Sequence, residues 1–195
     1  MISGRTMFNV KNLPKVTIIL VLIYLSLFIF DKSIFQGKLF EWGCGKSFSN
    51  LQGNEWYRVI TGSFFHANIF HLLGNAFAIF CVGIILENKM GSSYFLSIYL
   101  IGNIVESIIS AINSNYIRGC GASPGIYAII ACIVFLYLYN PGLLKLNFNE
   151  WSCNYTVWYF FLGNFIGIHG LVAHLIGFGS GIFVSSILLF RGTLK

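Results

Sequence analysis

Charged residues are scarce in this sequence of 195 residues, in which Asp, Glu, Lys and Arg together make up 9%. An ordinary soluble domain carries roughly 25%, so most of the surface of this protein is not suited to water. Hydrophobic residues make up 56%, and 21 glycines would let helices approach closely in lipid. The net charge of +6 is scattered between apolar runs, which argues against a nucleic-acid partner. The composition predicts one compact helical membrane protein.

Metal-binding patterns are also missing. The five cysteines show no pair spacing typical of a metal site; they are Cys44, Cys81, Cys120, Cys132 and Cys153. No carboxylate lies at a ligand spacing from His66, His71 or His174, which disfavours a zinc protease. We therefore expect no metal and no cofactor, and we interpret the cysteines as structural thiols. Cys44 and Cys120 are expected on the same side of the membrane, so a disulfide between them stays open.

No pattern indicates a cleaved leader, a repeat or a second domain. The first apolar run, Val16–Phe30, ends at Asp31 and Lys32 without a small-residue cleavage site, so we interpret it as a spanning helix. We expect a single domain over residues 1–195 that begins with a short cytoplasmic segment, 1–14. Basic residues place both termini in the cytoplasm by the positive-inside tendency: Arg5, Lys11, Lys15, Lys89, Lys145, Arg191 and Lys195. The plasma membrane is the expected location.

Six stretches approach the length of about 20 apolar residues that a spanning helix needs. They are Lys15–Phe30, Phe64–Leu86, Tyr94–Ile112, Ser123–Tyr139, Thr156–Ile168 and Leu171–Phe190. The fifth is the shortest, and a tight turn at His169 and Gly170 separates it from the sixth. The predicted fold is an all-α bundle of six transmembrane helices.

The segment from Asp31 to about Thr61 is too long for a simple connection and is rich in aromatic residues. Aromatic side chains of this kind favour the headgroup level of a bilayer. We expect a structured first loop that lies partly in the outer interface. A plain interfacial anchor is the alternative interpretation.

Polar residues inside a membrane are costly, so each one needs a partner or a function. The expected spans contain His66, His71, Asn75, Glu106, Ser123 and His174. With the N-terminus inside, the second, fourth and sixth spans begin on the outer side, so four of these residues can converge there: His71, Asn75, Ser123 and His174. Glu106 lies late in the third span, where a functional role and pairing with Asn103 or a buried backbone group are both open. For His66 we favour a hydrogen bond that orients the outer loop.

Ser123 follows a glycine-rich approach and opens the fourth span. A helix over Ser123–Tyr139 would be about 25 Å long, shorter than a hydrocarbon core of about 30 Å, so the serine would be submerged. The preceding loop would then dip into the membrane, which irregular backbone does only inside protein or beside a water-filled cavity. A submerged serine beside water suits hydrolysis. The alternative is that Ser123 is only a helix cap before Pro124.

Residues on three spans extend this pattern. His174 leads Gly177 and Gly181 along one helical face, and such small residues would let the sixth span pack closely against the fourth. Tyr127 shares a face with Ser123. On the second span, His71 and Asn75 lie four residues apart and could stabilise an oxyanion, or could simply bond between helices.

Several motifs resemble those of the rhomboid family of intramembrane serine proteases over nearly the whole chain. They are His66, His71 and Asn75 in the second span; Gly121-Ala122-Ser123 before the fourth; Ala173–Gly177 with Gly181 in the sixth; Glu55–Arg58 in the first loop; and Leu86–Gly91. The resemblance implies a six-helix core and a Ser–His dyad without a catalytic Asp. It also implies stacking of Tyr127 on the histidine and membrane-protein substrates. Two residues depart from the family pattern: Pro124 replaces a usual Gly, and Tyr57 a usual Trp.

The predicted function is peptide-bond hydrolysis inside the bilayer. Ser123 would attack the carbonyl of an unwound substrate helix after His174 takes its proton, and water would later hydrolyse the acyl-enzyme. His71, Asn75 and the N–H of Ser123 would stabilise the oxyanion. One rival is an inactive relative that binds transmembrane clients. Another is a small transporter, against which there is no inverted repeat.

Overall fold

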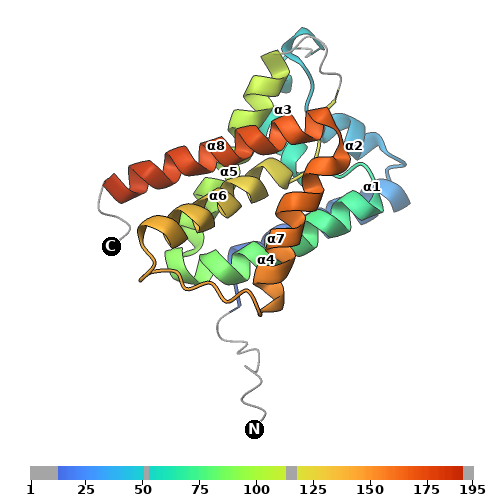
Figure 1. The fold of residues 1–195 in the computed structure, drawn as a ribbon. Helices are drawn as coiled ribbons and strands as arrows, with labels where there is room; N and C mark the ends of the chain where they lie inside the picture. Colours follow the sequence, from blue (N-terminus) through green and yellow to red (C-terminus); the bar gives the residue numbers. More distant parts are fainter. Residues whose placement is uncertain (1–12, 51–52, 113–117, 191–195) are drawn as a thin grey trace.

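The computed structural model describes residues 13–50, 53–112 and 118–190, which fold almost entirely as helices (Figure 1). The α-helices are α1 (Lys15–Ser33), α2 (Lys38–Gly43), α3 (Arg58–Thr61), α4 (Ile69–Met90), α5 (Ser92–Ile112), α6 (Ser123–Tyr139), α7 (Trp151–Leu162) and α8 (Ile168–Phe190). Short 3₁₀ turns are η2 (Phe48–Asn50), η3 (Glu55–Tyr57), η4 (Gly62–Phe64) and η5 (Gly163–Ile166). Within these ranges the backbone pairs in an extended form at one isolated bridge, between Gly45 and Gly119.

Four of the described helices are long and apolar enough to cross a membrane: α1, α4, α5 and α8. Helix α6 is apolar but has 17 residues, and α7 has 12. Large apolar side chains such as Phe70, Phe165 and Phe183 are exposed on the outside of the bundle. An all-helical, multi-pass membrane protein is thus confirmed.

The bounds expected for two of the spans, the second and the fifth, were wrong. The second span does not begin at Phe64, because η4 ends there and Asn68 caps α4 by accepting the N–H of His71 at 2.9 Å. His66 therefore lies in the preceding loop rather than in a helix.

The fifth helix runs over Trp151–Leu162 instead of Thr156–Ile168. The expected turn at His169 and Gly170 lies inside α8. The chain reverses at Gly167, whose φ of +124° is readily available only to glycine.

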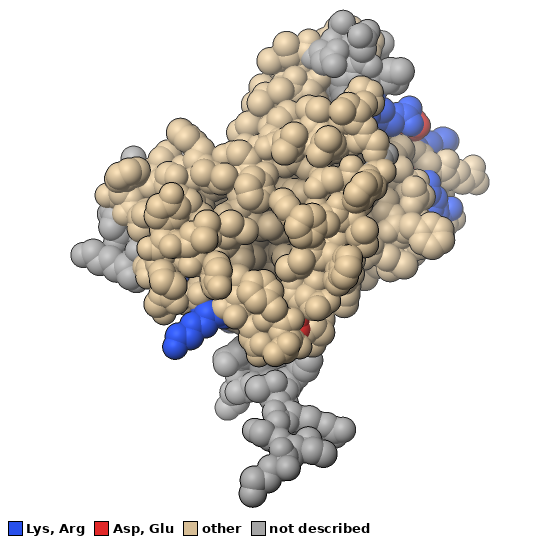
Figure 2. Space-filling model, in the orientation of Figure 1, with Lys and Arg blue, Asp and Glu red and all other residues tan. Residues whose placement is uncertain are grey.

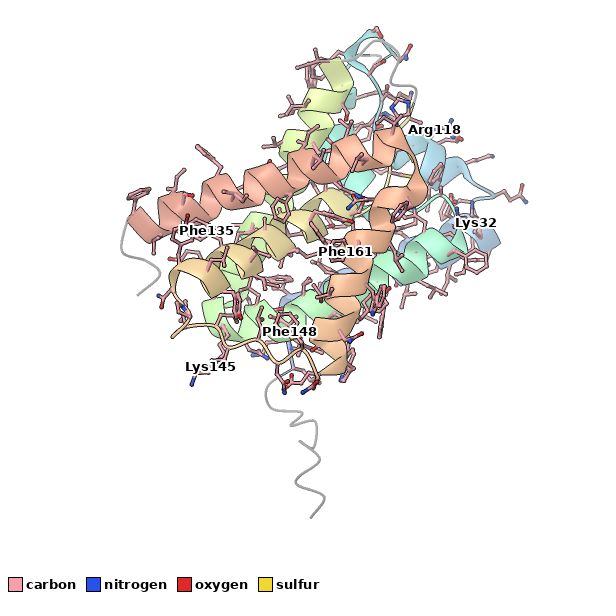
Figure 3. The ribbon with its side chains drawn as sticks, in the orientation of Figure 1. Lys32, Arg118, Phe135, Lys145, Phe148 and Phe161 are labelled. Atoms are coloured by element: carbon pink, nitrogen blue, oxygen red, sulfur yellow. The ribbon has the colours of Figure 1, made fainter. Side chains whose placement is uncertain are left out.

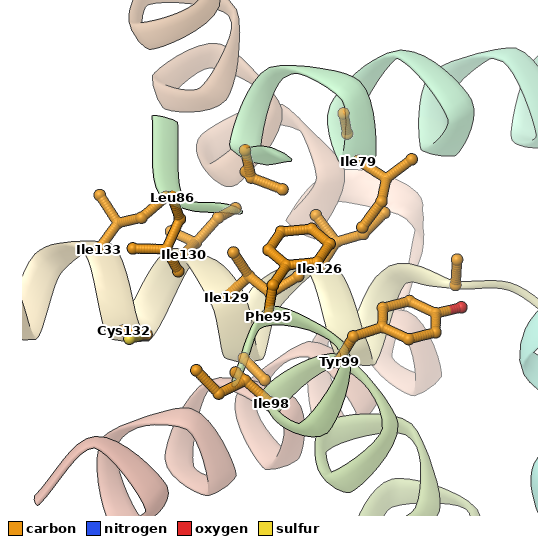
Figure 4. Close-up of a cluster of buried hydrophobic side chains, with 14 of the residues drawn as sticks. Ile79, Leu86, Phe95, Ile98, Tyr99, Ile126, Ile129, Ile130, Cys132 and Ile133 are labelled. Atoms are coloured by element: carbon orange, nitrogen blue, oxygen red, sulfur yellow. The ribbon is translucent and has the colours of Figure 1, made fainter. Parts of the chain in front are cut away.

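Helix α6 is the centre of the bundle, and α4, α5 and α8 pack around it. Figure 4 shows its isoleucines between Leu86 of α4 and Phe95 and Ile98 of α5. The whole first turns of α6 are buried except for the partly exposed Ser123. The nucleophile candidate is therefore held by the most enclosed helix of the protein.

Helix α8 approaches α6 backbone to backbone. A side chain at Gly177 would collide with the carbonyl oxygen of Pro124, and one at Gly181 would collide with that of Ala128. The small-residue stripe therefore lies against the helix that carries Ser123.

Basic residues lie at the two ends of an otherwise uncharged face (Figure 2). Lys32 and Arg118 lie at the end near α2, and Lys145 lies at the other (Figure 3). Arg5, Lys11, Arg191 and Lys195, which entered the topology prediction, and residues 1–12 of the expected 1–14 segment are outside the described residues.

Candidate functional site

The first loop is organised around a buried arginine. The guanidinium of Arg58 donates to the carbonyl oxygens of Glu41 at 2.8 Å and Cys44 at 3.0 Å, and it pairs with the Glu55 carboxylate. Charge-assisted bonds of this kind are about twice as strong as neutral ones. Arg58 thereby joins α2 to the 3₁₀ turns that follow it.

This loop also holds the segment that leads to Ser123. Gly45 and Gly119 exchange two backbone hydrogen bonds of 2.7 and 3.0 Å, and the N–H of Gly121 donates to the carbonyl of Gly62 at 3.1 Å. Arg118 makes a two-pronged ion pair with Glu41 at 2.7 and 2.6 Å. The first loop therefore supports the nucleophile segment, which an interfacial anchor alone would not do.

Ser123 is the first residue of α6, and Ala122 takes the cap position. Gly125 is the third residue of the helix, and its N–H donates to the side-chain oxygen of Asn103 in α5 at 3.1 Å. Because a side chain of a neighbouring helix caps α6, the hydroxyl of Ser123 does not serve as the helix cap, which was the alternative interpretation of this residue.

His174 is buried in α8, with 4% of its surface exposed. Its ring stacks on Tyr127 with centroids 4.0 Å apart and planes inclined by 9°. Its Nδ1 lies 3.0 Å from Oδ1 of Asn164 in η5. The ring is thus fixed on one face and at one edge.

The surroundings of Asn164 define the proton on His174. Nδ2 of Asn164 donates to the carbonyl of Phe160 at 2.7 Å, so Oδ1 is the atom that faces the histidine. Because this oxygen can only accept, Nδ1 of His174 carries the proton and Nε2 keeps its lone pair. The same Phe160 carbonyl accepts from the hydroxyl of Tyr127 at 2.9 Å, so both neighbours of the ring share one anchor.

Sequence reasoning missed Asn164. It lies ten residues before His174, beyond the end of α7, and no motif draws attention to it. In the described chain the hydrogen bond of the His174 ring goes to Asn164 and not to Ser123, which sits on the facing helix. Catalytic hydrogen bonds are often longer in a protein without substrate.

His71 and Asn75 of α4 converge on the backbone just before Ser123. A Cβ placed on Gly121 would lie 2.6 Å from the His71 ring and 3.4 Å from Nδ2 of Asn75, and the φ of Gly121 is +115°. Glycine is therefore needed here both for conformation and for space. Oδ1 of Asn75 accepts from the hydroxyl of Tyr159 at 2.6 Å, whereas its buried Nδ2 has no hydrogen-bond partner among the described residues.

His66 packs between Tyr24 and His71, with ring centroids 5.1 Å from each. Both of its ring nitrogens are buried, and within the part of the chain that the structure describes neither makes a hydrogen bond. Burial, together with the charge that His71 can carry, lowers the pKa of His66 to about 3. His66 is therefore neutral at physiological pH and fills space beside His71.

Glu106 is buried in the second half of α5, and it accepts a hydrogen bond of 2.6 Å from Ser110. Of the alternatives left open for Glu106, pairing with Asn103 is not made, because Asn103 binds Gly125 and the carbonyl of Tyr99. Among the residues that the structure describes, no three His, Cys, Asp or Glu side chains are placed to hold a metal ion.

Comparison with known proteins gives a consistent result. The Rhomboid domain family model matches residues 53–191. The chain is 36% identical to rhomboid protease GluP of Bacillus subtilis over 95 residues, which is 49% of this chain and 18% of that protein. It is 28% identical to the putative rhomboid protease YdcA of the same species over 140 residues, 69% of this chain and 68% of that one.

A third relative is named as inactive. The chain is 23% identical over 130 residues to the inactive RHOMBOID-like protein 8 of Arabidopsis thaliana, covering 63% of this chain and 37% of that protein. The match to GluP spans less than a fifth of the length of that relative. Similarity alone therefore does not decide between a protease and an inactive relative.

Proposed function

The chain belongs to the rhomboid family, and on this premise we propose that it is an intramembrane serine protease with Ser123 as nucleophile and His174 as general base. The observation that carries the proposal is the environment of His174. Its ring is stacked on Tyr127 and its Nδ1 is bound by Asn164, so the basic Nε2 is left free. An oriented base on a helix packed against the nucleophile helix is the arrangement that activates a serine.

The reaction proceeds through an acyl-enzyme. Ser123 attacks the carbonyl carbon of the scissile peptide while its proton passes to Nε2 of His174. The histidine then gives that proton to the leaving nitrogen, and a water molecule hydrolyses the ester with the same histidine as base. Asn164 and Tyr127 keep the ring in place through both steps.

The oxyanion of the tetrahedral intermediate would bind beside Gly121. The unpartnered Nδ2 of Asn75 supports this, because a buried donor without an acceptor costs about 1–3 kcal/mol in the resting protein. An oxyanion would supply the missing acceptor, and His71 lies next to it. Tyr159 fixes the Asn75 amide through its oxygen, which turns the N–H₂ group toward Gly121.

Pro124 limits the backbone donors at this site. It has no N–H, and the N–H of Gly125 is occupied by Asn103. Of the first residues of α6, Ser123 itself therefore supplies the backbone N–H, at a helix N-terminus that favours negative charge.

Helices α6 and α7 would complete six membrane crossings with the four longer helices, in one rhomboid domain over residues 1–195. Both termini would lie in the cytoplasm, and the first loop would lie at the opposite surface of the plasma membrane. The substrates would be membrane proteins cut within or near a transmembrane segment. Helix α6, with 17 residues, is shorter than a full crossing, so Ser123 would sit below the outer surface.

An inactive, client-binding protein is the second candidate, favoured by the relative that is named as inactive. Cleavage of a panel of single-span membrane proteins by the purified protein in detergent separates the two. We expect wild type to cut and both Ser123→Ala and His174→Ala to be inert. Ser186→Ala changes a partly exposed residue of α8 and His169→Ala an exposed one, and these are the matched controls.

The outcome is decisive in both directions. Full cleavage by Ser123→Ala would contradict the assignment of the nucleophile. If wild type cuts nothing and a fluorophosphonate does not label Ser123, the client-binding candidate replaces the protease.

A further inference from the structure

Two cysteines that the proposed protease does not use face each other beside its nucleophile segment. Gly45 and Gly119 exchange both backbone hydrogen bonds of an antiparallel bridge. Their outer neighbours, Cys44 and Cys120, are then directly opposite each other as a non-hydrogen-bonded pair, for which the Cα atoms are typically about 4.5 Å apart. Disulfides span Cα separations of about 4.4–6.8 Å, so this register suits one without movement of the backbone.

The two thiols are in contact and differ in exposure. Cys44 and Cys120 share a side-chain hydrogen bond, and both are free thiols in this structure. Cys44 is 1% exposed, whereas Cys120 is partly exposed. A reagent would therefore reach Cys120 first. The remaining cysteines lie in the helices α4, α6 and α7.

We propose that Cys44 and Cys120 form a redox-active dithiol that low-molecular-weight disulfides oxidise by thiol–disulfide exchange. The Cys120 thiolate attacks one sulfur of the reagent RSSR, forming a mixed disulfide and releasing RS⁻, which takes up the proton that Cys120 lost. Cys44 then attacks the Cys120 sulfur, and the second RS⁻ leaves with the proton of Cys44. The protein loses two protons and two electrons, and RSSR becomes two RSH.

The surroundings assign these two roles. The hydrogen bond from Cys44 lowers the pKa of Cys120 to about 5, and a hydrogen bond from His71 contributes as well. The same hydrogen bond to Cys120, together with burial, raises the pKa of Cys44. Cys120 is therefore the attacking thiolate and Cys44 the resolving thiol.

The bond would have a defined structural effect. It would join the end of α2 covalently to the segment that precedes Gly121 and Ser123, where two backbone hydrogen bonds now hold the chain. It would also replace the Cys120 thiolate, which interacts with His71, by a neutral disulfide sulfur.

The test uses the purified full chain in detergent with oxidised glutathione, followed by alkylation of free thiols, digestion and mass spectrometry. Wild type is expected to give Cys44 and Cys120 peptides joined with the loss of two hydrogens. Cys44→Ser is expected to retain one glutathione on Cys120, because the resolving thiol is missing. Cys120→Ser is expected to retain none on Cys44. Cys132→Ser is the matched control and should form the same link as wild type.

Two results would overturn the proposal. One is a wild-type protein whose Cys120 remains fully alkylated after oxidation. The other is a link between Cys81 and Cys153, which also lie near each other, in place of the expected one. The readout is independent of proteolysis, because Ser123→Ala should form the same disulfide whether or not the chain cuts peptides.

Discussion

At the scale of single residues, the ring of His174, the proposed base, is oriented without a carboxylate. Tyr127 covers one face of its ring, and Asn164 binds its Nδ1. The two partners are coupled, since both donate to the carbonyl of Phe160. A neutral amide fixes the tautomer while avoiding the cost of a buried charge in the membrane. In the proposed mechanism Asn164 would orient the histidine as the asparagine does in a Cys–His–Asn triad.

Replacing Asn164 by alanine should slow cleavage by about fivefold or more, because a hydrogen bond worth about 1 kcal/mol or more no longer holds the tautomer that the proposed mechanism needs. KM should change little, since Asn164 acts through His174. Asn154→Ala, an exposed change in α7, is the matched control. Kinetics on one transmembrane substrate would give both constants.

A second readout separates positioning from structure. In ¹⁵N-histidine NMR of Ser123→Ala, which is expected to be inert, His174 should be protonated at Nδ1. The added Asn164→Ala change should shift part of the signal toward the Nε2-protonated form. An unchanged spectrum would show that Asn164 does not set the tautomer.

At the scale of helices, the contact between α6 and α8 determines whether the proposed dyad of Ser123 and His174 can meet. Gly177 touches the backbone of Pro124, the residue next to Ser123, and Gly181 touches that of Ala128; on α8, His174 lies about one and two turns before these glycines. Without Cβ atoms, the two helices approach more closely than larger residues would allow. The separation of the two proposed catalytic side chains is therefore set by glycines that have no role in the proposed chemistry.

Gly181→Leu should separate these helices, because its side chain would enter the space of the Ala128 carbonyl. Overpacking of this kind costs about 1–3 kcal/mol, and the loss of activity should be larger than the loss of stability. Gly179→Leu is a well-matched control, since a Cβ at Gly179 meets nothing within 4 Å. Thermal unfolding in detergent and cleavage rates measure the two effects. Equal behaviour of the two variants would show that the close contact is not required.

At the scale of the whole molecule, sequence patterns predicted those features that depend on residues adjacent in the chain, such as the ends of a helix. The bounds of α6 follow from Pro124 at its start and Pro141 after its end, and the expected Ser123–Tyr139 agrees with the structure. The start of α7 and the turn at Gly167 were misjudged, because glycine and aromatic residues there fit several backbone paths. Asn164 and the bridge between Gly45 and Gly119 could not be predicted, since each depends on contacts between distant segments.

The first loop is the clearest case of such long-range organisation. Two arginines allow a test: Arg58 within the loop, and Arg118, which pairs with Glu41 of the loop from the segment before α6. Arg58 has 5% of its side chain exposed and binds two carbonyl oxygens and Glu55. Arg58→Gln should lower the stability by about 3 kcal/mol or more, because hydrogen bonds to charged groups contribute about 1.5–3 kcal/mol each. Arg118 and Glu41 are 44% and 57% exposed, so Arg118→Gln should cost no more than about 1 kcal/mol.

Thermal unfolding in detergent should therefore rank Arg58→Gln far below Arg118→Gln and wild type. Cleavage should follow the same order, since Arg58 fixes the loop whose residues Gly45 and Gly62 hold the segment before Ser123. If Arg58→Gln were as stable as wild type but cut slowly, the loop would act on substrate rather than on the fold. If both properties were unchanged, the buried arginine would not be what ties the first loop to the nucleophile, and the backbone pairing of Gly45 with Gly119 would be sufficient on its own.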